Sequence, residues 1–326
     1  MGEPAGIGGE IALKAWAARR GDTPAFFVID DANRLEALAA RFNIACPVAS
    51  IADPAAAVQT FSRALPVLLP TRPLTGPVTL GVPTAAAASA VIGAIDQAVA
   101  LVKSAAAAGL VTSPINKDSL QGAGFSYPGH TEYLGHLAGG AQAVMMLAVE
   151  GLRVVPVTVH VAIQDVARTL STAGIVSCGR ITAAALKTDF GIVHPRLVIA
   201  ALNPHAGEKG RMGNEETRII APAVAQLRAD GIDATGPSPA DTLFHAAARR
   251  NFDAALCMYH DQALIPLKTI DFAGGVNITL GLPFVRTSPD HGTAFDIADR
   301  GIADPSSLLA ALRTAGAIAS RRANGP

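Results

Sequence analysis

The chain has 326 residues, of which 50% are hydrophobic, and its formal net charge at pH 7 is zero. This length can bury a large core and suits one large domain or two of moderate size. The balanced charge excludes a strongly basic surface of the kind that binds nucleic acid or an anionic membrane. The cysteines are too few and too scattered for a disulfide framework or a four-thiolate zinc site, and they suit a reducing cytoplasm: Cys46, Cys178 and Cys257.

The sequence contains one run that approaches the length of a membrane span, TAAAASAVIGAIDQAVALV at residues 84–102. It is rich in alanine and carries Asp96, so it predicts a buried helix rather than a span. The N-terminal residues lack the charged and apolar regions of a secretory signal. We therefore expect a cytoplasmic protein without membrane partners.

The first ten residues, MGEPAGIGGE, form a glycine-rich turn that leads into a helical pattern. A turn of this kind normally follows a β-strand and presents backbone N–H groups to an anionic ligand. The alternative is a simple helix-entry turn. We expect a strand upstream of Met1 to support the turn.

Short β-rich runs then alternate with longer helical runs, which favours an α/β fold with mostly parallel strands. Residues 143–163 predict two strands around a turn at Glu150 and Gly151, so the sheet is expected to be mixed. A further strand is predicted at 25–30, and the segments 107–114, 195–207 and 252–262 each predict a strand that ends in a loop. Helices are predicted at 31–42, at 165–171 with Gln164 or Asp165 as the cap, and at 214–231 with Gly231 as the stop.

Polar residues gather where these strands end, in the segments TSPINK, VTVHVA, LNPHAGE and MYHDQ. Open α/β sheets build their sites at the carboxyl ends of their strands, so the pattern favours an enzyme. His160, His205 and His260 each occupy such a position. Three imidazoles are a common catalytic ligand set for zinc and related ions, although each can equally be a buried, hydrogen-bonded histidine.

Two further segments carry groups that suit an anionic substrate. In YPGHTEYLGHL, His130 and Thr131 stand at the start of a helix, where they can bind a phosphate or, alternatively, where Thr131 caps the helix. The segment 260–298 places Lys268, Asn277 and Arg286 among apolar residues and glycines. Converging Lys and Arg side chains indicate a substrate with more than one negative charge.

Taken together, these motifs resemble the 4-hydroxythreonine-4-phosphate dehydrogenase family of pyridoxal phosphate biosynthesis. The resemblance rests on GEPAGIGGEI, TSPINK, YPGHTE, LNPHAGE with GRMGNEE, GPSPADT, MYHDQALIPLK and GVNITLGLPFVRTSPDHGTAFDIA. It implies a two-lobed fold similar to isopropylmalate and isocitrate dehydrogenases, which bind NAD without a G-x-G-x-x-G fingerprint. The expected lobes are 1–125 plus 275–326 for the cofactor and 126–274 for substrate, metal and dimerisation. The active site is expected in the cleft between them.

The resemblance also assigns roles to residues of this sequence. His160, His205 and His260 would hold one divalent metal, contributed across a homodimer interface; zinc is expected, and magnesium, manganese or cobalt would also serve. The substrate would be bound by His130, Thr131, Lys268, Asn277 and Arg286, and catalysis would use Lys268 and Asp241. The cofactor, NAD or NADP, would lie near Gly6, Gly8, Asp290, His291 and Gly292. The roles of Glu3, Asn116 and Lys117 are left open. Family members carry roughly ten more residues before the opening turn, which would form the first strand.

The implied reaction is oxidation of 4-phosphohydroxy-L-threonine to a β-keto acid, followed by decarboxylation to 3-amino-2-oxopropyl phosphate. A paralogue acting on 4-phospho-D-threonate or 4-phospho-D-erythronate keeps the same motifs and remains an alternative. A dihydrodiol-dicarboxylate dehydrogenase would not need the GHT motif, and a phosphate acyltransferase would not need the strand-end histidines. The non-catalytic alternative is a metal that only holds the two subunits of a dimer together.

Overall fold

The computed structural model describes residues 1–127 and 129–325. The chain divides into two compact units. Unit 1 comprises Met1–Gln142 and Leu282–Ala319, and unit 2 comprises Ala143–Gly281 and the chain from Ser320 onward. The predicted lobes had other bounds, since residues 126–142 fall in unit 1 and residues 275–281 in unit 2. Which unit serves the cofactor and which the substrate stays a prediction.

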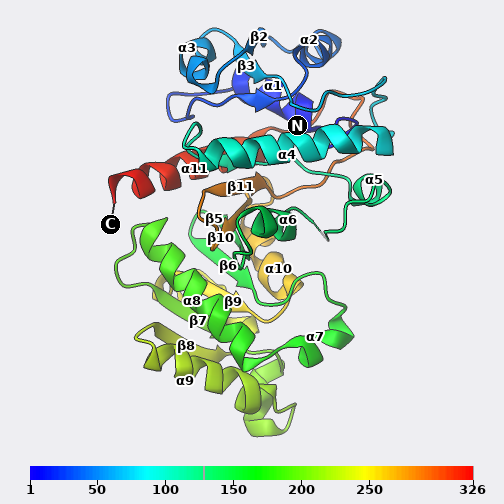
Figure 1. Ribbon diagram of the computed structural model, residues 1–326. Coiled ribbons are helices and arrows are strands. Elements are labelled where there is room, and N and C mark those ends of the chain that lie inside the picture. The colour runs from blue at the N-terminus through cyan, green and yellow to red at the C-terminus, as the bar shows by residue number, and fades with distance from the viewer. Residues whose placement is uncertain (128, 326) are drawn as a thin grey trace. The chain divides into compact units, whose positions relative to one another are not determined.

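Unit 1 contains a parallel sheet of three short strands in the order β1-β3-β2 and a further parallel pair, β4 and β11; β2, β3 and β11 are labelled in Figure 1. The strands are β1 (Val28–Ile29), β2 (Val48–Ile51), β3 (Leu65–Leu68), β4 (Leu110–Val111) and β11 (Arg286–Pro289). The predicted strand at 25–30 thus shortens to two paired residues. The helices are α1 (Gly8–Ala17), α2 (Ala32–Arg41), α3 (Ala57–Phe61), α4 (Ala88–Lys103), α5 (Lys117–Gln121), α6 (His130–Leu137) and α11 (Ser306–Asn324), which continues past Ser320.

Helices α1 and α2 pack on the three-stranded sheet through one apolar cluster. Leu13, Trp16, Leu35 and Leu65 are its central members. Asp31 caps α2, because its carboxylate accepts a hydrogen bond from the backbone N–H of Arg34 at 3.1 Å. The apolar period of residues 31–42 therefore forms the helix that the sequence predicts.

Helix α4, with the short 3₁₀ turn before it, is the stretch predicted to be a buried helix. By length and composition alone, Ala85–Lys103 could cross a membrane, and it is the one such stretch among the described residues. Val91, Ile95 and Val99 are buried within unit 1, and Asp96 in its middle accepts a hydrogen bond from the Tyr133 hydroxyl. A helix buried in a protein core can have the same length and composition, so this stretch is weak support for a membrane span.

Unit 2 contains a mixed sheet in the order β10-β5-β6-β9-β7-β8. Strands β6, β9, β7 and β8 are parallel neighbours, whereas β5 is antiparallel to both β6 and β10. The strands are β5 (Val144–Val149), β6 (Leu152–Pro156), β7 (Arg196–Ala200), β8 (Asp233–Ser238), β9 (Ala254–Cys257) and β10 (Val276–Leu280). The α/β class, the mixed sheet and the hairpin at Glu150 and Gly151 are confirmed.

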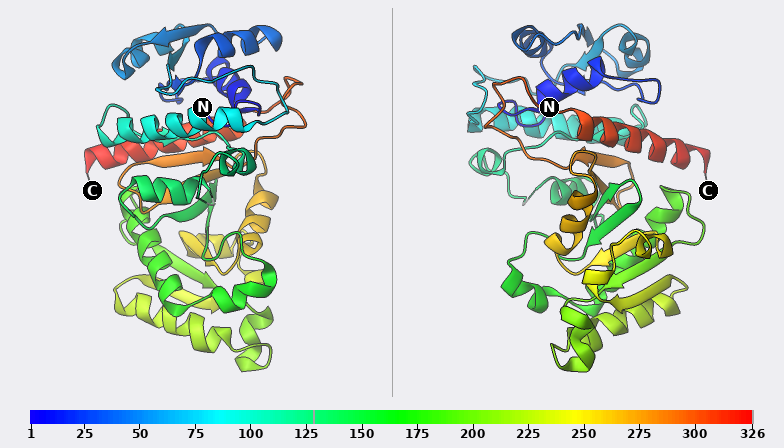
Figure 2. Two further views of the ribbon diagram at one scale, coloured as in Figure 1. Left: turned by 45° about the vertical axis from the view of Figure 1, so that its right-hand side comes forward. Right: turned by 180° about the vertical axis from the view of Figure 1, so that it is seen from behind.

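Helices cover both faces of this sheet, α8 and α9 on one face and α10 on the other (Figures 1 and 2). The core between α10 and the strands includes Leu147, Val154, Val198, Leu264 and Leu267. The helices are α7 (Ile163–Thr169), α8 (Thr172–Thr188), α9 (Ala221–Ala229), preceded by a π-helical turn at Glu216–Ile220, and α10 (His260–Ile270). Ala162 occupies the N-cap position of α7. The predicted cap at Gln164 or Asp165 is wrong, because both residues lie inside the first turn.

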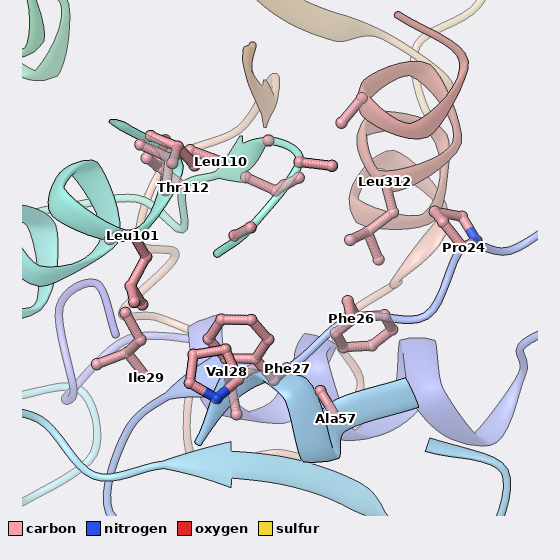
Figure 3. A pocket seen from close by; sticks show the side chains of 18 of the residues that line it. Pro24, Phe26, Phe27, Val28, Ile29, Ala57, Leu101, Leu110, Thr112 and Leu312 are labelled. Carbon is pink, nitrogen blue, oxygen red and sulfur yellow. The ribbon is translucent and has the colours of Figure 1, made fainter. Parts of the chain in front are cut away.

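An apolar cavity of about 360 Å³ lies within unit 1 (Figure 3). Its walls come from β1 and the residues before it, from β4, and from α4 and α11, including Phe27, Ile29, Leu101, Leu110 and Leu312. The Met1 ammonium lies at its edge and donates a hydrogen bond to the Ile29 carbonyl at 2.6 Å, while the Glu3 N–H donates to the Pro114 carbonyl at 2.9 Å. Residues 1–3 thus connect the segment that ends β1 with the segment that follows β4.

We predict that an extended, apolar segment fused ahead of Met1 raises the melting temperature. It would enter the cavity beside two strand edges, and each buried CH₂ group contributes about 0.8 kcal/mol. Scanning calorimetry of the fusion checks this. The matched control is a fusion of equal length with alternating prolines, which cannot pair as a strand. Equal melting temperatures for the two fusions would show that the cavity does not accept a strand.

Candidate active site

Three predicted ligand residues lie beyond the carboxyl ends of neighbouring strands in unit 2. His160 follows β6, His260 follows β9 and His205 follows β7. These strands are adjacent and parallel in the order β6-β9-β7, with Val154 beside Ala255 and Val198 beside Ala255. Their loops therefore leave the same edge of the sheet, with the His260 loop between the other two.

The structure brings His160 and His260 together. Their ring centroids are 6.2 Å apart, with 35° between the ring planes. Nδ1 of His260 lies 2.7 Å from a carboxylate oxygen of Asp261. Because a carboxylate accepts, this contact favours the tautomer with the proton on Nδ1, which leaves Nε2 as the lone-pair donor and is the usual arrangement of an imidazole ligand. His160 itself has a left-handed backbone, with φ of 53°. Such strain in a non-glycine residue is typical of functional sites.

His205 stands in a strained loop. Five successive residues from His205 to Lys209 have positive φ, between 41° and 73°. A left-handed conformation costs about 1–2 kcal/mol for each non-glycine residue, so the surrounding structure must hold the loop in place. The buried carboxylate of Glu216 holds the start of the loop: its Oε1 accepts from the backbone N–H groups of Leu202 at 2.9 Å and Asn203 at 2.7 Å.

His205 does not complete a ligand set with the other two histidines. Among residues 1–127 and 129–325, no group of three His, Cys, Asp or Glu side chains could hold a metal ion. The described chain therefore supplies a pair of adjacent imidazoles and a third imidazole on a rigid loop at the same edge of the sheet.

The other predicted residues of unit 2 occupy separate positions. Lys268 is on α10, two turns after His260, and its ammonium lies 5.4 Å from the ring centroid of Phe272. Asn277 is on β10, and its Oδ1 is buried with no hydrogen-bond partner among the described residues. A buried, unpaired amide oxygen is costly and fits a group that binds a ligand. Asp241 is exposed, in a short 3₁₀ turn after β8.

Unit 1 holds Arg286 as a buried cation. It is the first residue of β11, 4% exposed, and its Nη2 donates to the Thr112 hydroxyl at 2.7 Å. Burial lowers the pKa of the Arg286 guanidinium to about 10, so it remains protonated at neutral pH.

His130 and Thr131 open helix α6, and Gly129 occupies its N-cap position. The alternative role of Thr131 as the cap is therefore wrong. Burial, then the charge of Arg286 and then the Met1 ammonium lower the pKa of His130 to about 3. The imidazole is neutral at physiological pH and can offer one N–H donor. A Cβ at Gly129 would lie 3.8 Å from Nζ of Lys117, so that ammonium also stands near the start of α6. A helix N-terminus with nearby cations suits an anion such as phosphate.

The opening turn packs against two other predicted motifs. The Ile7 N–H donates to the Thr293 carbonyl at 3.1 Å. A Cβ at Gly6 would lie 2.8 Å from that same carbonyl oxygen, and one at Gly8 would lie 3.2 Å from Cβ of Ser113. Glycine is therefore required at Gly6 by the close approach of another backbone segment. The structure thus joins GEPAGIGG to the segment DHGT and to the segment TSP.

The remaining residues of these motifs have distinct contacts. Nδ1 of His291 lies 2.9 Å from the Gly292 carbonyl oxygen, and its Nε2 is buried with no partner among the described residues. The Asp290 N–H donates to the Ser307 hydroxyl at 3.0 Å. Glu3 is 4% exposed, and burial raises the pKa of its carboxyl. Asn116 caps α5, since its Oδ1 accepts from the Ser119 N–H at 2.7 Å, which gives it a structural role.

Four polar residues at these sites were not singled out from the sequence: Thr112, Thr158, Glu216 and Gln262. All are buried, and they hydrogen-bond to residues between 4 and 174 positions away in the chain. Thr158 and Gln262 each lie two positions from a candidate histidine, and that proximity is the signal that could have found them; Thr112 and Glu216 have no such neighbour.

Comparison with known proteins identifies the family. The family model described as "Pyridoxal phosphate biosynthetic protein PdxA" matches residues 22–315. A 4-hydroxythreonine-4-phosphate dehydrogenase of Caulobacter vibrioides is 53% identical over 327 residues, covering 98% of this chain and 96% of that protein. The same enzyme of Methylorubrum populi is 54% identical over 332 residues, covering 99% and 94%.

A solved structure agrees. The crystal structure of 4-hydroxythreonine-4-phosphate dehydrogenase from Klebsiella pneumoniae superimposes with a TM-score of 0.86 at 38% identity, covering 98% of this chain and 96% of that one. The resemblance that the motifs indicate is thereby confirmed along nearly the whole sequence. The chain belongs to the PdxA family of pyridoxal phosphate biosynthetic proteins.

Proposed function

We propose that the protein is a metal-dependent, NAD- or NADP-dependent dehydrogenase of the cytoplasm that converts 4-phosphohydroxy-L-threonine to 3-amino-2-oxopropyl phosphate. The observation that carries this proposal is the proximity of two imidazole rings: the ring centroids of His160 and His260 lie 6.2 Å apart, and the Asp261 carboxylate lies 2.7 Å from Nδ1 of His260. The names of relatives more than 50% identical over 98% or more of this chain support the substrate.

We propose that a divalent metal is bound by the imidazoles of His160 and His260, with His205 as a third ligand. We propose that the set is completed across a homodimer. Exposed apolar side chains on the same segments as the histidines support this: Ile163, Met212, Ile265, Ile270 and Phe272.

When bound, the metal lowers the pKa of a substrate hydroxyl and the nicotinamide accepts a hydride. The chain's own groups bind and orient the substrate. Arg286 and the start of α6, with His130 and Thr131, neutralise and hydrogen-bond a phosphate or carboxylate. Asn277 offers its unpaired Oδ1 to a donor such as an amine, and Lys268 pairs with an anionic group. We place Asp241 with Lys268 in proton transfer during the oxidation and the loss of CO₂. Gly6, Gly8, Asp290, His291 and Gly292 are proposed to contact the dinucleotide.

The first prediction concerns the reaction itself. The purified protein reduces NAD or NADP in the presence of 4-phosphohydroxy-L-threonine, and a chelator abolishes the reduction because the histidines then hold no metal. Absorbance of the reduced nicotinamide measures the rate against a panel that includes 4-phospho-D-threonate and 4-phospho-D-erythronate. Turnover of a D-series acid alone would assign the protein to a paralogous activity. Absence of any nicotinamide reduction would favour an acyltransferase.

A second prediction separates a catalytic metal from a structural one. His160→Ala leaves a folded protein of unchanged oligomeric state, because His160 lies in a loop and not in the core. Loss of a residue that only hydrogen-bonds to a metal ligand lowers activity by about 10–100-fold. Because His160 is proposed as a ligand itself, kcat/KM of the variant falls by more than this. Circular dichroism, light scattering and steady-state kinetics measure these properties. The matched control is His194→Ala, an exposed histidine before β7, which retains activity. Dissociation or unfolding of the His160 variant would instead indicate a metal that staples a dimer.

A third prediction follows from the lowered pKa of His130. In the unfolded chain this imidazole titrates near 6.5, whereas in the folded protein its pKa is about 3. Between these values the unfolded state binds a proton that the folded state does not, so the free energy of unfolding decreases as the pH falls from 6.5 to 3. His130→Gln removes this contribution, so its unfolding free energy, measured with urea, declines less steeply over that range. Equal slopes for the two proteins would contradict the neutral state of His130.

A further inference from the structure

Besides the three histidines, buried polar residues connect the three histidine loops of unit 2 through a series of hydrogen bonds to their backbone. We call Thr158, Gln262 and Glu216, with the backbone groups they bind, the loop lock. Their side chains are buried, with exposed fractions of 6%, 7% and 3%. Burial of three polar side chains is costly unless each finds partners.

The lock starts at the loop that carries His160. The Thr158 hydroxyl donates to the Met258 carbonyl at 2.7 Å, which joins the residues after β6 to those after β9. These two residues are 100 positions apart in the sequence and two positions before His160 and His260, respectively. The bond therefore fixes the approach of the two loops whose imidazoles meet.

Gln262 is the centre of the lock and uses both ends of its amide. Its Oε1 accepts from the Met258 N–H at 2.6 Å, and its Nε2 donates to the Ala201 carbonyl at 2.7 Å. The first bond closes the His260 turn on itself, and the second ties that turn to the end of β7. An amide is required for this, because only a group with both a donor and an acceptor can make the two bonds.

Glu216 continues from Ala201 to the loop that carries His205. It binds the next two backbone N–H groups, those of Leu202 and Asn203, and its Oε2 accepts from Nδ2 of Asn203 at 3.0 Å. A Cβ at Gly207 would lie 2.5 Å from the same Oε2. The carboxylate thus holds the two residues after Ala201, which lead into the left-handed turn at His205, and lies against Gly207 within that turn.

We propose that Gln262, with Thr158 and Glu216, is a positioning residue that sets the placement of the histidine loops and so the affinity of the site for its metal. This rests on the proposed role of the histidines as ligands. None of the three lock residues is itself assigned as a ligand; each acts through backbone groups next to a histidine. Metal sites lose about 10–100-fold in affinity when such outer partners are removed.

The test compares Gln262→Met, which keeps the length of the side chain and removes both hydrogen bonds, with Thr182→Val. Thr182 is fully buried on α8 and bonds only within its own helix, to the Cys178 carbonyl at 2.8 Å. Both variants lose buried hydrogen bonds in unit 2, so Thr182→Val controls for a general loss of stability. Calorimetric titration of the metal-free, full-length proteins with Co²⁺ measures affinity, and the visible absorption of bound Co²⁺ reports its coordination.

We expect Gln262→Met to weaken Co²⁺ binding by about 10–100-fold and to change the absorption spectrum, whereas Thr182→Val retains wild-type values. Gln262→Met also accelerates hydrogen exchange at the Met258 amide in the metal-free protein, a result independent of any metal. If Gln262→Met does not fold, the test uses Thr158→Val instead. This variant removes one hydrogen bond of the lock, so a smaller loss of Co²⁺ affinity is expected.

Two negative results have different meanings. A wild-type protein that binds no Co²⁺ contradicts the proposed metal site, and the role of the lock falls with it. A wild-type protein that binds Co²⁺, combined with a Gln262 variant of equal affinity and spectrum, overturns the positioning role alone.

Discussion

Because β6, β9 and β7 are parallel neighbours, the chain leaves all three strands at one edge of the sheet. This arrangement places the three histidine loops side by side. Two imidazoles reach each other across adjacent loops, and the third stands one strand away. Parallel strands also need long crossover connections, so the histidines are separated by 45 and 55 residues although their loops are neighbours. The wide spacing of the three histidines in the sequence is thus a consequence of the topology.

Parts of the fold could be predicted because they depend on local patterns. Two short apolar runs on either side of a turn at Glu150 and Gly151 specified the antiparallel pair β5 and β6. Asp31 before an apolar helical period specified the start of α2. The strand-end positions of His160, His205 and His260 were equally readable, since each follows a short apolar run. The family resemblance added roles that the pattern alone left open.

What could not be predicted depends on contacts between distant parts of the chain. Gln262 binds a carbonyl 61 residues away, and Thr112 binds Arg286 across 174 residues. Both residues lie in polar segments that the sequence marks, MYHDQ and TSPINK, but a single sequence does not show that their side chains are buried or which distant groups they bind. The predicted caps of α6 and α7 are also wrong. The helices begin at His130 and Ile163, so that Gly129 and Ala162 take the N-cap positions instead of the polar residues nearby.

The candidate residues of unit 2 suit a cation, whereas those of unit 1 suit an anion. In unit 2, imidazoles must be neutral to donate lone pairs, and Asp261 fixes the tautomer of His260 without adding a positive charge. In unit 1, burial keeps His130 neutral while Arg286, with a pKa of about 10, stays charged. A protonated His130 would be repelled by Arg286 and the helix N-terminus, so the same surroundings that favour an anion exclude a second buried cation. The neutral imidazole therefore adds a hydrogen-bond donor, and the guanidinium supplies the charge.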